Sequence, residues 1–275
     1  MSDTHLEKRY FQTPSGAIAY WISDNVCPEQ PWIVFLPGLT ADHRLFGRQV
    51  SNFAKSMNLL VWDAPSHGQS RPFALNWSLD DKALWLKEIL DNERVSNPVL
   101  VGQSMGGYVS QAFMDLFPCV AKGFVSIDSC PLQRSYYQGW ELWSLKHTKA
   151  MFMAFPWKML VDLGSKGNAT SSYGQELMRE MMQDYDKCEY CELSAHGFKV
   201  LAQAVETNRA YEPDCPVLLI CGEEDGAGSA KRYNREWSKR KGIPIHWIEG
   251  AGHNSNTDKP NAVNSLLDEF VKSLS

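Results

Sequence analysis

The chain has 275 residues, of which 44% are hydrophobic and 21% are charged, a balance that fits a packed globular protein. Its formal net charge is −5 and its basic residues are scattered, so we do not expect a nucleic acid as partner. No uncharged apolar run of about 18 residues occurs, and residues 1–12 lack the apolar stretch of a signal peptide, so we expect no membrane partner. Seven cysteines without framework spacing fit reduced thiols, and the expected location is the cytoplasm.

Short apolar runs alternate with amphipathic stretches in the first half of the chain. In chain order, the runs with strand composition are residues 17–22, 31–36, 58–63, 97–103 and 121–128. The stretches with helical spacing of apolar positions are residues 44–57, 79–93 and 105–117. Apolar strands separated by helices indicate a mostly parallel sheet that is covered on both faces.

The alternation stops after this half. Residues 130–213 contain helix-like pieces crowded with aromatic residues and methionines. Strand composition returns at residues 216–221 and 243–248, with a charged helix between them and a last helix at residues 258–274. An irregular loop of this length is uncommon, so we predict an α/β core, formed by residues 1–129 and 214–275, that is interrupted by a helical insertion at 130–213.

A G-x-S-x-G motif spans Gly102 to Gly106, directly after an apolar strand and before a helical stretch. In that setting a sharp turn holds a serine at the carboxyl edge of the sheet. The glycines leave room around a strained serine backbone. We therefore predict Ser104 as the nucleophile of an enzyme.

A serine hydroxyl needs a general base, and His253 is the best-placed histidine. It follows the last predicted strand, and the small residues of Gly250-Ala251-Gly252 precede it. An acid that orients the histidine should follow the next-to-last strand, where Asp225 stands. Asp128, after the strand that follows the serine helix, is the competing position.

The oxyanion of an acyl-transfer intermediate needs backbone N–H donors. One predicted donor is the amide of Met105, directly after the nucleophile. The other is the amide of Leu39, in the Pro37-Gly38-Leu39-Thr40 loop that follows an early strand. A simple tight turn is the alternative interpretation of this loop.

We predict neither a cofactor nor a metal. The early glycine loop lacks a G-x-G-x-x-G fingerprint. Cys188 and Cys191, with His196 after them, resemble part of a metal site, but no further ligand pair completes the four ligands of a structural zinc. Their spacing is better explained by one face of a helix.

Five landmarks together resemble the α/β-hydrolase superfamily, and within it the small members with a cap. They are Leu36-Pro37-Gly38, the segment Asp63–Ser70, the serine motif, Gly222–Asp225 and Gly250–Asn254. The chain departs from the family at Pro37, where His is usual, and at Ser66, which replaces the first glycine of D-x-x-G-x-G-x-S. The resemblance implies the α/β-hydrolase fold, with residues 130–213 as its helical cap. Asp63 and His67 are expected to anchor their turn.

The function that we expect is serine esterase chemistry through Ser104, His253 and Asp225, on a small and apolar ester or related carbonyl compound. The aromatic residues and methionines of the insertion would roof its pocket. The resemblance also allows carbon–carbon bond hydrolysis, a lyase reaction, or a slow ligand receptor. The sequence leaves open whether the chain forms a homodimer.

Overall fold

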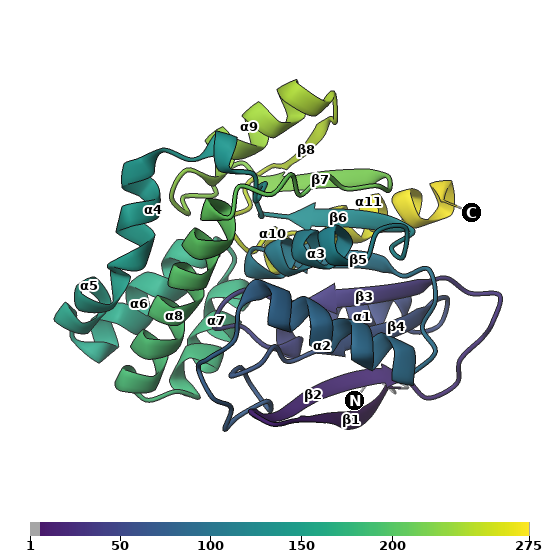
Figure 1. Cartoon of the computed structure of the whole chain (residues 1–275), viewed down its shortest axis with the longest axis horizontal. Helices are drawn as coiled ribbons and strands as arrows, with labels where there is room; N and C mark the ends of the chain where they lie inside the picture. Colours follow the sequence, from purple (N-terminus) through teal and green to yellow (C-terminus); the bar gives the residue numbers. More distant parts are fainter. Residues whose placement is uncertain (1–5, 275) are drawn as a thin grey trace.

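The computed structural model describes residues 6–274, which form one eight-stranded sheet in the order β1-β2-β4-β3-β5-β6-β7-β8 (Figure 1). The strands are β1 (Leu6–Thr13), β2 (Gly16–Ser23), β3 (Trp32–Leu36), β4 (Asn58–Trp62), β5 (Val99–Gln103), β6 (Gly123–Ile127), β7 (Val217–Gly222) and β8 (Ile245–Ile248). The pairs β1–β2 and β2–β4 are antiparallel, and the other neighbours are parallel. This mostly parallel sheet confirms the predicted fold class.

The central strands are buried on both faces, since every residue of β3, β4, β5 and β6 is buried. The helices of the core are the 3₁₀ helix η1 (His43–Phe46), α1 (Gly47–Phe53), α2 (Leu79–Asn92), α3 (Met105–Leu116), α9 (Ala230–Lys241), α10 (Ser255–Asp258) and α11 (Pro260–Ser273). Helix α2 packs against α3, and α1 packs against α11. Burial on both faces explains why these strands are continuous apolar runs in the sequence.

Two local elements differ from the sequence-based prediction. β1 was not predicted, because it is a polar edge strand whose side chains are all exposed or half-buried and which pairs, within residues 6–274, with β2 alone. The helix expected at residues 44–57 is shorter, because a 3₁₀ turn at His43–Phe46 precedes α1 and α1 ends at Phe53.

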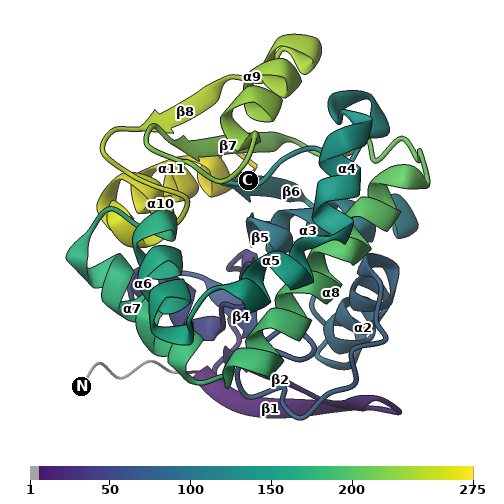
Figure 2. The ribbon, with the colours of Figure 1, turned by 90° about the vertical axis from the view of Figure 1, so that its left-hand side faces the viewer.

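Between β6 and β7 the chain is helical, with a 3₁₀ turn η2 (Arg134–Tyr136) followed by α4 (Gly139–Lys146), α5 (Thr148–Ala154), α6 (Trp157–Asn168), α7 (Ser172–Gln183) and α8 (Lys187–Glu206). We call α4 to α8 the cap helices; Figure 2 is viewed from their side. Helix α6 packs on α7, and both α4 and α5 pack on α8. The division into a core and a cap at residues 130 and 213 stays a prediction. No helix among residues 6–274 combines the length and apolar character needed to cross a membrane.

Candidate active site

Ser104 lies between β5 and α3 in a strained backbone conformation, with φ 49° and ψ −115°. Its surroundings are too tight for side chains on the flanking glycines. A Cβ on Gly106 would lie 1.8 Å from the backbone oxygen of Leu36, and a Cβ on Gly102 would lie 2.4 Å from the backbone of Gly106. The G-x-S-x-G spacing therefore packs the turn against β3 and presents the serine side chain beyond the end of β5.

His253 joins Ser104 and Asp225 in one hydrogen-bonded chain. Its Nε2 is 2.9 Å from Ser104 Oγ, and its Nδ1 is 3.0 Å from Asp225 Oδ2. When Nδ1–H donates to the carboxylate, Nε2 carries the lone pair that accepts the serine proton. Ser104, Asp225 and His253 are far apart in the sequence, but the fold brings them into the two contacts that activation of the serine requires.

The aspartate and the histidine of this chain are screened from water, which strengthens the electrostatic coupling between them. Asp225 and His253 are both buried. Burial lowers the pKa of His253, but the charge and hydrogen bond of Asp225, with the charge of Asp128, outweigh this effect and raise the pKa above 6.5. The imidazolium that would form after proton transfer is therefore stabilised by the neighbouring carboxylates.

Asp128, the alternative acid, makes no hydrogen bond with His253 among the described residues. Its Oδ1 accepts the amide of Gly222 at 2.7 Å, and its Oδ2 accepts the amide and the hydroxyl of Ser255 at 2.9 and 2.6 Å. Burial raises the pKa of Asp128 to about 7. The structure thus brings Asp225, rather than Asp128, into contact with the histidine.

Leu39 and Met105, the predicted oxyanion donors, line the same cavity as Ser104. Within residues 6–274, neither backbone amide donates a hydrogen bond. Two amide N–H groups therefore remain available beside the serine, as an oxyanion hole requires.

Gln103 is a site residue that the sequence analysis missed. Its Nε2 donates to the backbone oxygen of His253 at 2.8 Å and to Asn254 Oδ1 at 3.1 Å. Its side chain is buried, and its position directly before the nucleophile is the only sequence signal that could have identified it. Gln103 therefore ties the serine turn to the loop that carries His253.

The cavity above Ser104 measures about 690 Å³ and lies between the core and the cap helices. Its cap-side wall is mostly apolar and includes Met151, Phe152, Phe155, Leu160, Leu163 and Phe198. Tyr108, Tyr137, Tyr233 and Glu141 form a more polar part of the wall. No lysine or arginine of the described chain lines the cavity, whereas Glu141 and Asp128 do.

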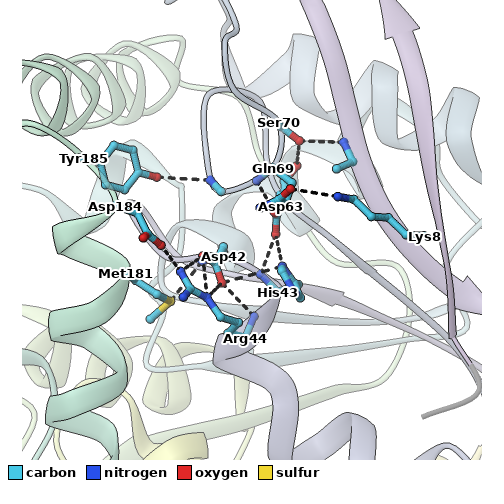
Figure 3. A network of polar contacts seen from close by, with 12 residues as sticks. Lys8, Asp42, His43, Arg44, Asp63, Gln69, Ser70, Met181, Asp184 and Tyr185 are labelled. Atoms are coloured by element: carbon cyan, nitrogen blue, oxygen red, sulfur yellow. Dashed lines mark hydrogen bonds and ion pairs between the residues drawn. The ribbon is translucent and has the colours of Figure 1, made fainter. Parts of the chain in front are cut away.

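The turn after β4 is held by Asp63, as expected for an anchoring residue. Asp63 is fully buried, and its carboxylate accepts the backbone amides of His43 and Gln69 at 2.7 and 2.6 Å (Figure 3). The hydroxyl of Ser70 donates to its backbone oxygen at 2.7 Å. His67 is also buried in this turn, where its Nδ1 lies 2.9 Å from the oxygen of Pro65.

Two groups in the described part place three potential metal ligands within 4.8 Å of one another: Asp42 with His43 and Asp63, and Asp128 with Cys221 and Asp225. In the first group, the Arg44 guanidinium already pairs with Asp42, and Asp63 accepts three hydrogen bonds. In the second, burial raises the pKa of the Cys221 thiol, and both carboxylates accept hydrogen bonds. In both groups, the carboxylates that could bind a metal already have other partners.

Comparison with known proteins finds relatives in sequence and in fold. A curated relative from Citrobacter koseri, a 2-succinyl-6-hydroxy-2,4-cyclohexadiene-1-carboxylate synthase, is 26% identical over 259 residues, which cover 89% of this chain and 95% of that protein. A hydrolase from Pseudomonas aeruginosa has the same fold, with a TM-score of 0.79 and 18% identity over 96% of this chain and 98% of the other. The enol-lactonase from Burkholderia xenovorans gives a TM-score of 0.75 and 19% identity over 96% of this chain and all of that one.

A sequence model of the alpha/beta hydrolase family matches residues 33–266. The match includes the serine turn at the end of β5, Asp225 after β7 and His253 before α10. Because it spans most of the chain, the protein belongs to the alpha/beta hydrolase family.

Proposed function

We propose that this protein is a serine hydrolase that cleaves a small, uncharged and apolar ester, or a related carbonyl compound, through an acyl-serine intermediate. The observation that carries the proposal is the hydrogen-bonded chain Ser104–His253–Asp225, with distances of 2.9 and 3.0 Å, at the base of a largely apolar cavity. Such a chain in a buried site is the arrangement that activates a serine hydroxyl.

The proposed reaction begins when Ser104 Oγ attacks the substrate carbonyl while His253 Nε2 takes the hydroxyl proton. Asp225 accepts the Nδ1–H bond and stabilises the imidazolium, and the Leu39 and Met105 amides donate to the oxyanion. The C–O bond to the leaving alcohol then breaks, and His253 returns the proton to that alcohol. Water then attacks the acyl-serine while His253 takes its proton. The bond from the carbonyl carbon to Ser104 Oγ breaks, the carboxylic acid leaves, and His253 returns the proton to Ser104 Oγ.

The electrostatics of the cavity support an uncharged substrate. Its described lining holds no cation beyond the histidine, while Glu141 and Asp128 are both acids. A carboxylate in the substrate would lose its hydration without gaining a lysine or arginine partner, at a cost of about 3 kcal/mol or more. Met151, Phe152 and Phe198 instead offer contacts to an apolar chain.

Elimination chemistry without an acyl-serine is the second candidate, because the Citrobacter koseri relative is named as the synthase of a cyclohexadiene carboxylate. In such a reaction the same histidine and serine would act as acid and base. The absence of a lysine or arginine from the described lining argues against a carboxylate of that kind as the natural compound here.

The first experiment is the intact mass of the protein after treatment with a fluorophosphonate, for the wild type and for Ser104→Ala and His253→Ala. We expect one adduct on the wild type, no adduct at the active site of Ser104→Ala, and strongly slowed labelling of His253→Ala. A wild type that stays unlabelled would contradict the acyl-serine mechanism and favour elimination. Slow turnover of every substrate, with a large ligand-induced rise in melting temperature, would favour a receptor instead.

The second experiment compares 4-nitrophenyl butanoate with the 4-nitrophenyl monoester of succinic acid. These esters have the same leaving group and acyl length, and differ in a terminal methyl against a carboxylate. We expect kcat/KM for butanoate to be higher by about 100-fold, the factor that corresponds to about 3 kcal/mol. Equal values would contradict the proposed preference for an uncharged substrate without affecting the acyl-serine mechanism.

A further inference from the structure

Large hydrophobic side chains are exposed on the outer surface of three cap helices. They are Trp140, Trp143, Met151, Met153, Met159 and Leu163, with exposures between 39% and 69%. These six make up more than half of the eleven exposed large hydrophobic residues in the described chain, although α4, α5 and α6 contain few of its residues. We call this set the cap patch. A concentration of this kind on one surface indicates a binding face.

Half of the cap patch lies at the opening of the cavity above Ser104. Trp140, Met151 and Leu163 line this cavity, yet 69%, 51% and 49% of their surfaces are exposed. A side chain that both lines a cavity and contacts solvent lies at its mouth. Figure 2 shows α4, α5 and α6 on the side of the molecule that faces the viewer. A binding partner that covers the cap patch would therefore also cover the entrance to the cavity above Ser104.

The charges on α4, α5 and α6 are mainly positive, in a chain whose net charge is −5. Their four lysines, Lys146, Lys149, Lys158 and Lys166, are exposed, whereas Glu141 is buried and paired with Arg232. The other acid, Asp162, pairs with Lys166.

Two of the remaining lysines also have partners, since Lys146 and Lys149 pair with Glu206 and Glu192 of α8. Lys158 forms no ion pair within residues 6–274. The two acids of these helices are therefore paired, and Lys158, next to the exposed Met159, is left without an ion pair among the described residues.

From these observations we propose that the cap patch docks on a lipid surface that contains anionic headgroups. Tryptophan and methionine side chains would enter the boundary between headgroups and acyl chains, while the unpaired Lys158 reaches the headgroups. The mouth of the cavity would then open toward the lipid. Docking does not depend on the proposed hydrolase function. The uptake of an apolar ester from the lipid does rest on that proposed function. The expectation of no membrane partner was based on the lack of a membrane-spanning segment and of a signal peptide. Docking on a lipid surface requires neither of these.

The test is cosedimentation of the full-length protein with vesicles of phosphatidylcholine, with and without phosphatidylserine. All proteins carry Ser104→Ala, so that binding is measured without turnover and stays informative even if the enzyme mechanism is wrong. The patch variant is Trp143→Ser with Met159→Ser, two residues that do not line the cavity. The control is Val26→Ser with Leu84→Ser, which removes two hydrophobic residues elsewhere that are 51% and 45% exposed.

We expect the patch variant to bind anionic vesicles about tenfold more weakly, and the control to bind like its parent. Lys158→Glu should weaken binding to vesicles with phosphatidylserine and leave binding to pure phosphatidylcholine unchanged. Equal melting temperatures of both double variants would exclude a folding defect. Absence of vesicle binding, or equal losses in both double variants, would overturn the proposal. So would a concentration-dependent dimer in sedimentation velocity that disappears in the patch variant, because the face would then be a subunit interface.

Discussion

Asp128 holds Ser255 by two hydrogen bonds, one from the amide at 2.9 Å and one from the hydroxyl at 2.6 Å. Ser255 lies two residues after His253, at the start of α10, so this contact fixes the end of the loop that carries the imidazole. The same carboxylate accepts the amide of Gly222 at the end of β7, three residues before Asp225. Asp128 therefore connects the two loops whose side chains meet in the His253–Asp225 contact.

The two acids are expected to respond differently to replacement. Asp225→Asn should lower the rate of fluorophosphonate labelling by about 10⁴-fold, because an amide at this position favours the wrong histidine tautomer. Asp128→Asn should lower it by about tenfold or less, since the His253–Asp225 contact remains. The measurement is the labelling rate constant by intact mass, and a reversal of the two effects would make Asp128 the triad acid.

The pH dependence of labelling should report His253. The neutral imidazole is the active form, and the carboxylates raise its pKa, so the rate should rise with pH through a midpoint above 6.5. The charge of Asp128 contributes to this increase, so the midpoint of Asp128→Asn should lie at lower pH than that of the wild type. Because Asp128 itself has a pKa of about 7, the wild-type curve should be broader than that of a single group. An unchanged midpoint in the variant would show that Asp128 does not act on His253.

Much of the fold was predictable because its strands are buried on both faces. The apolar runs of β3 and β5 have no other simple explanation, and the order of Ser104, Asp225 and His253 follows from where each strand ends. The polar strand β1 was missed because it lies at the edge of the sheet, where it pairs with β2 and none of its side chains is fully buried.

The connections within the site depend on side-chain geometry that the sequence does not display. Gln103 and the backbone of His253 are 150 residues apart, and Asp128 and Ser255 are 127 residues apart. Two aspartates after neighbouring strands were both reasonable triad acids from sequence. The strands before these aspartates, β6 and β7, lie beside each other, so both carboxylates end near the imidazole loop. The hydrogen bonds separate them: Asp225 contacts His253, whereas Asp128 accepts the amide of Gly222.

Gly106→Ala tests how tightly the serine turn is packed. The added methyl would lie 1.8 Å from the backbone oxygen of Leu36, which cannot move without displacing β3. We expect a loss of unfolding free energy of about 3 kcal/mol or more, together with loss of labelling. Gly167→Ala is the matched control, because a Cβ at this helical position has nothing within 4 Å and should be neutral or stabilising by up to about 1 kcal/mol. Equal stability of the two variants in urea unfolding would contradict the close packing of the turn.

Lys82 provides a test of stability that is separate from catalysis. Its side chain is buried at 1% exposure, and its Nζ lies 3.6 Å from the centre of the Trp77 ring. It forms no ion pair within the described chain, and burial lowers the pKa of its amine from 10.5 to about 7. The ring attracts the ammonium group and offsets part of the cost of burying the charge.

A lowered pKa means that the unfolded chain binds this proton more tightly than the folded protein does. The resulting destabilisation is fully present below pH 7, and it disappears as the pH rises from about 7 to 10.5. Lys82→Met keeps an unbranched chain on Trp77 without the charge, so we expect it to raise the free energy of unfolding below pH 7 by about 2 kcal/mol. This corresponds to a rise in melting temperature of about 5 °C. The gain should vanish near pH 10.

Lys87→Met on the same helix is the matched control for Lys82→Met. Lys87 pairs with Asp91 at the surface, so its loss should change the unfolding free energy by less than about 0.5 kcal/mol at any pH. Melting curves of both variants between pH 6 and about pH 10 make the comparison. If Lys82→Met were destabilising at pH 6, the contact of the ammonium group with Trp77 would outweigh the cost of its burial, and the lowered pKa of Lys82 would be contradicted.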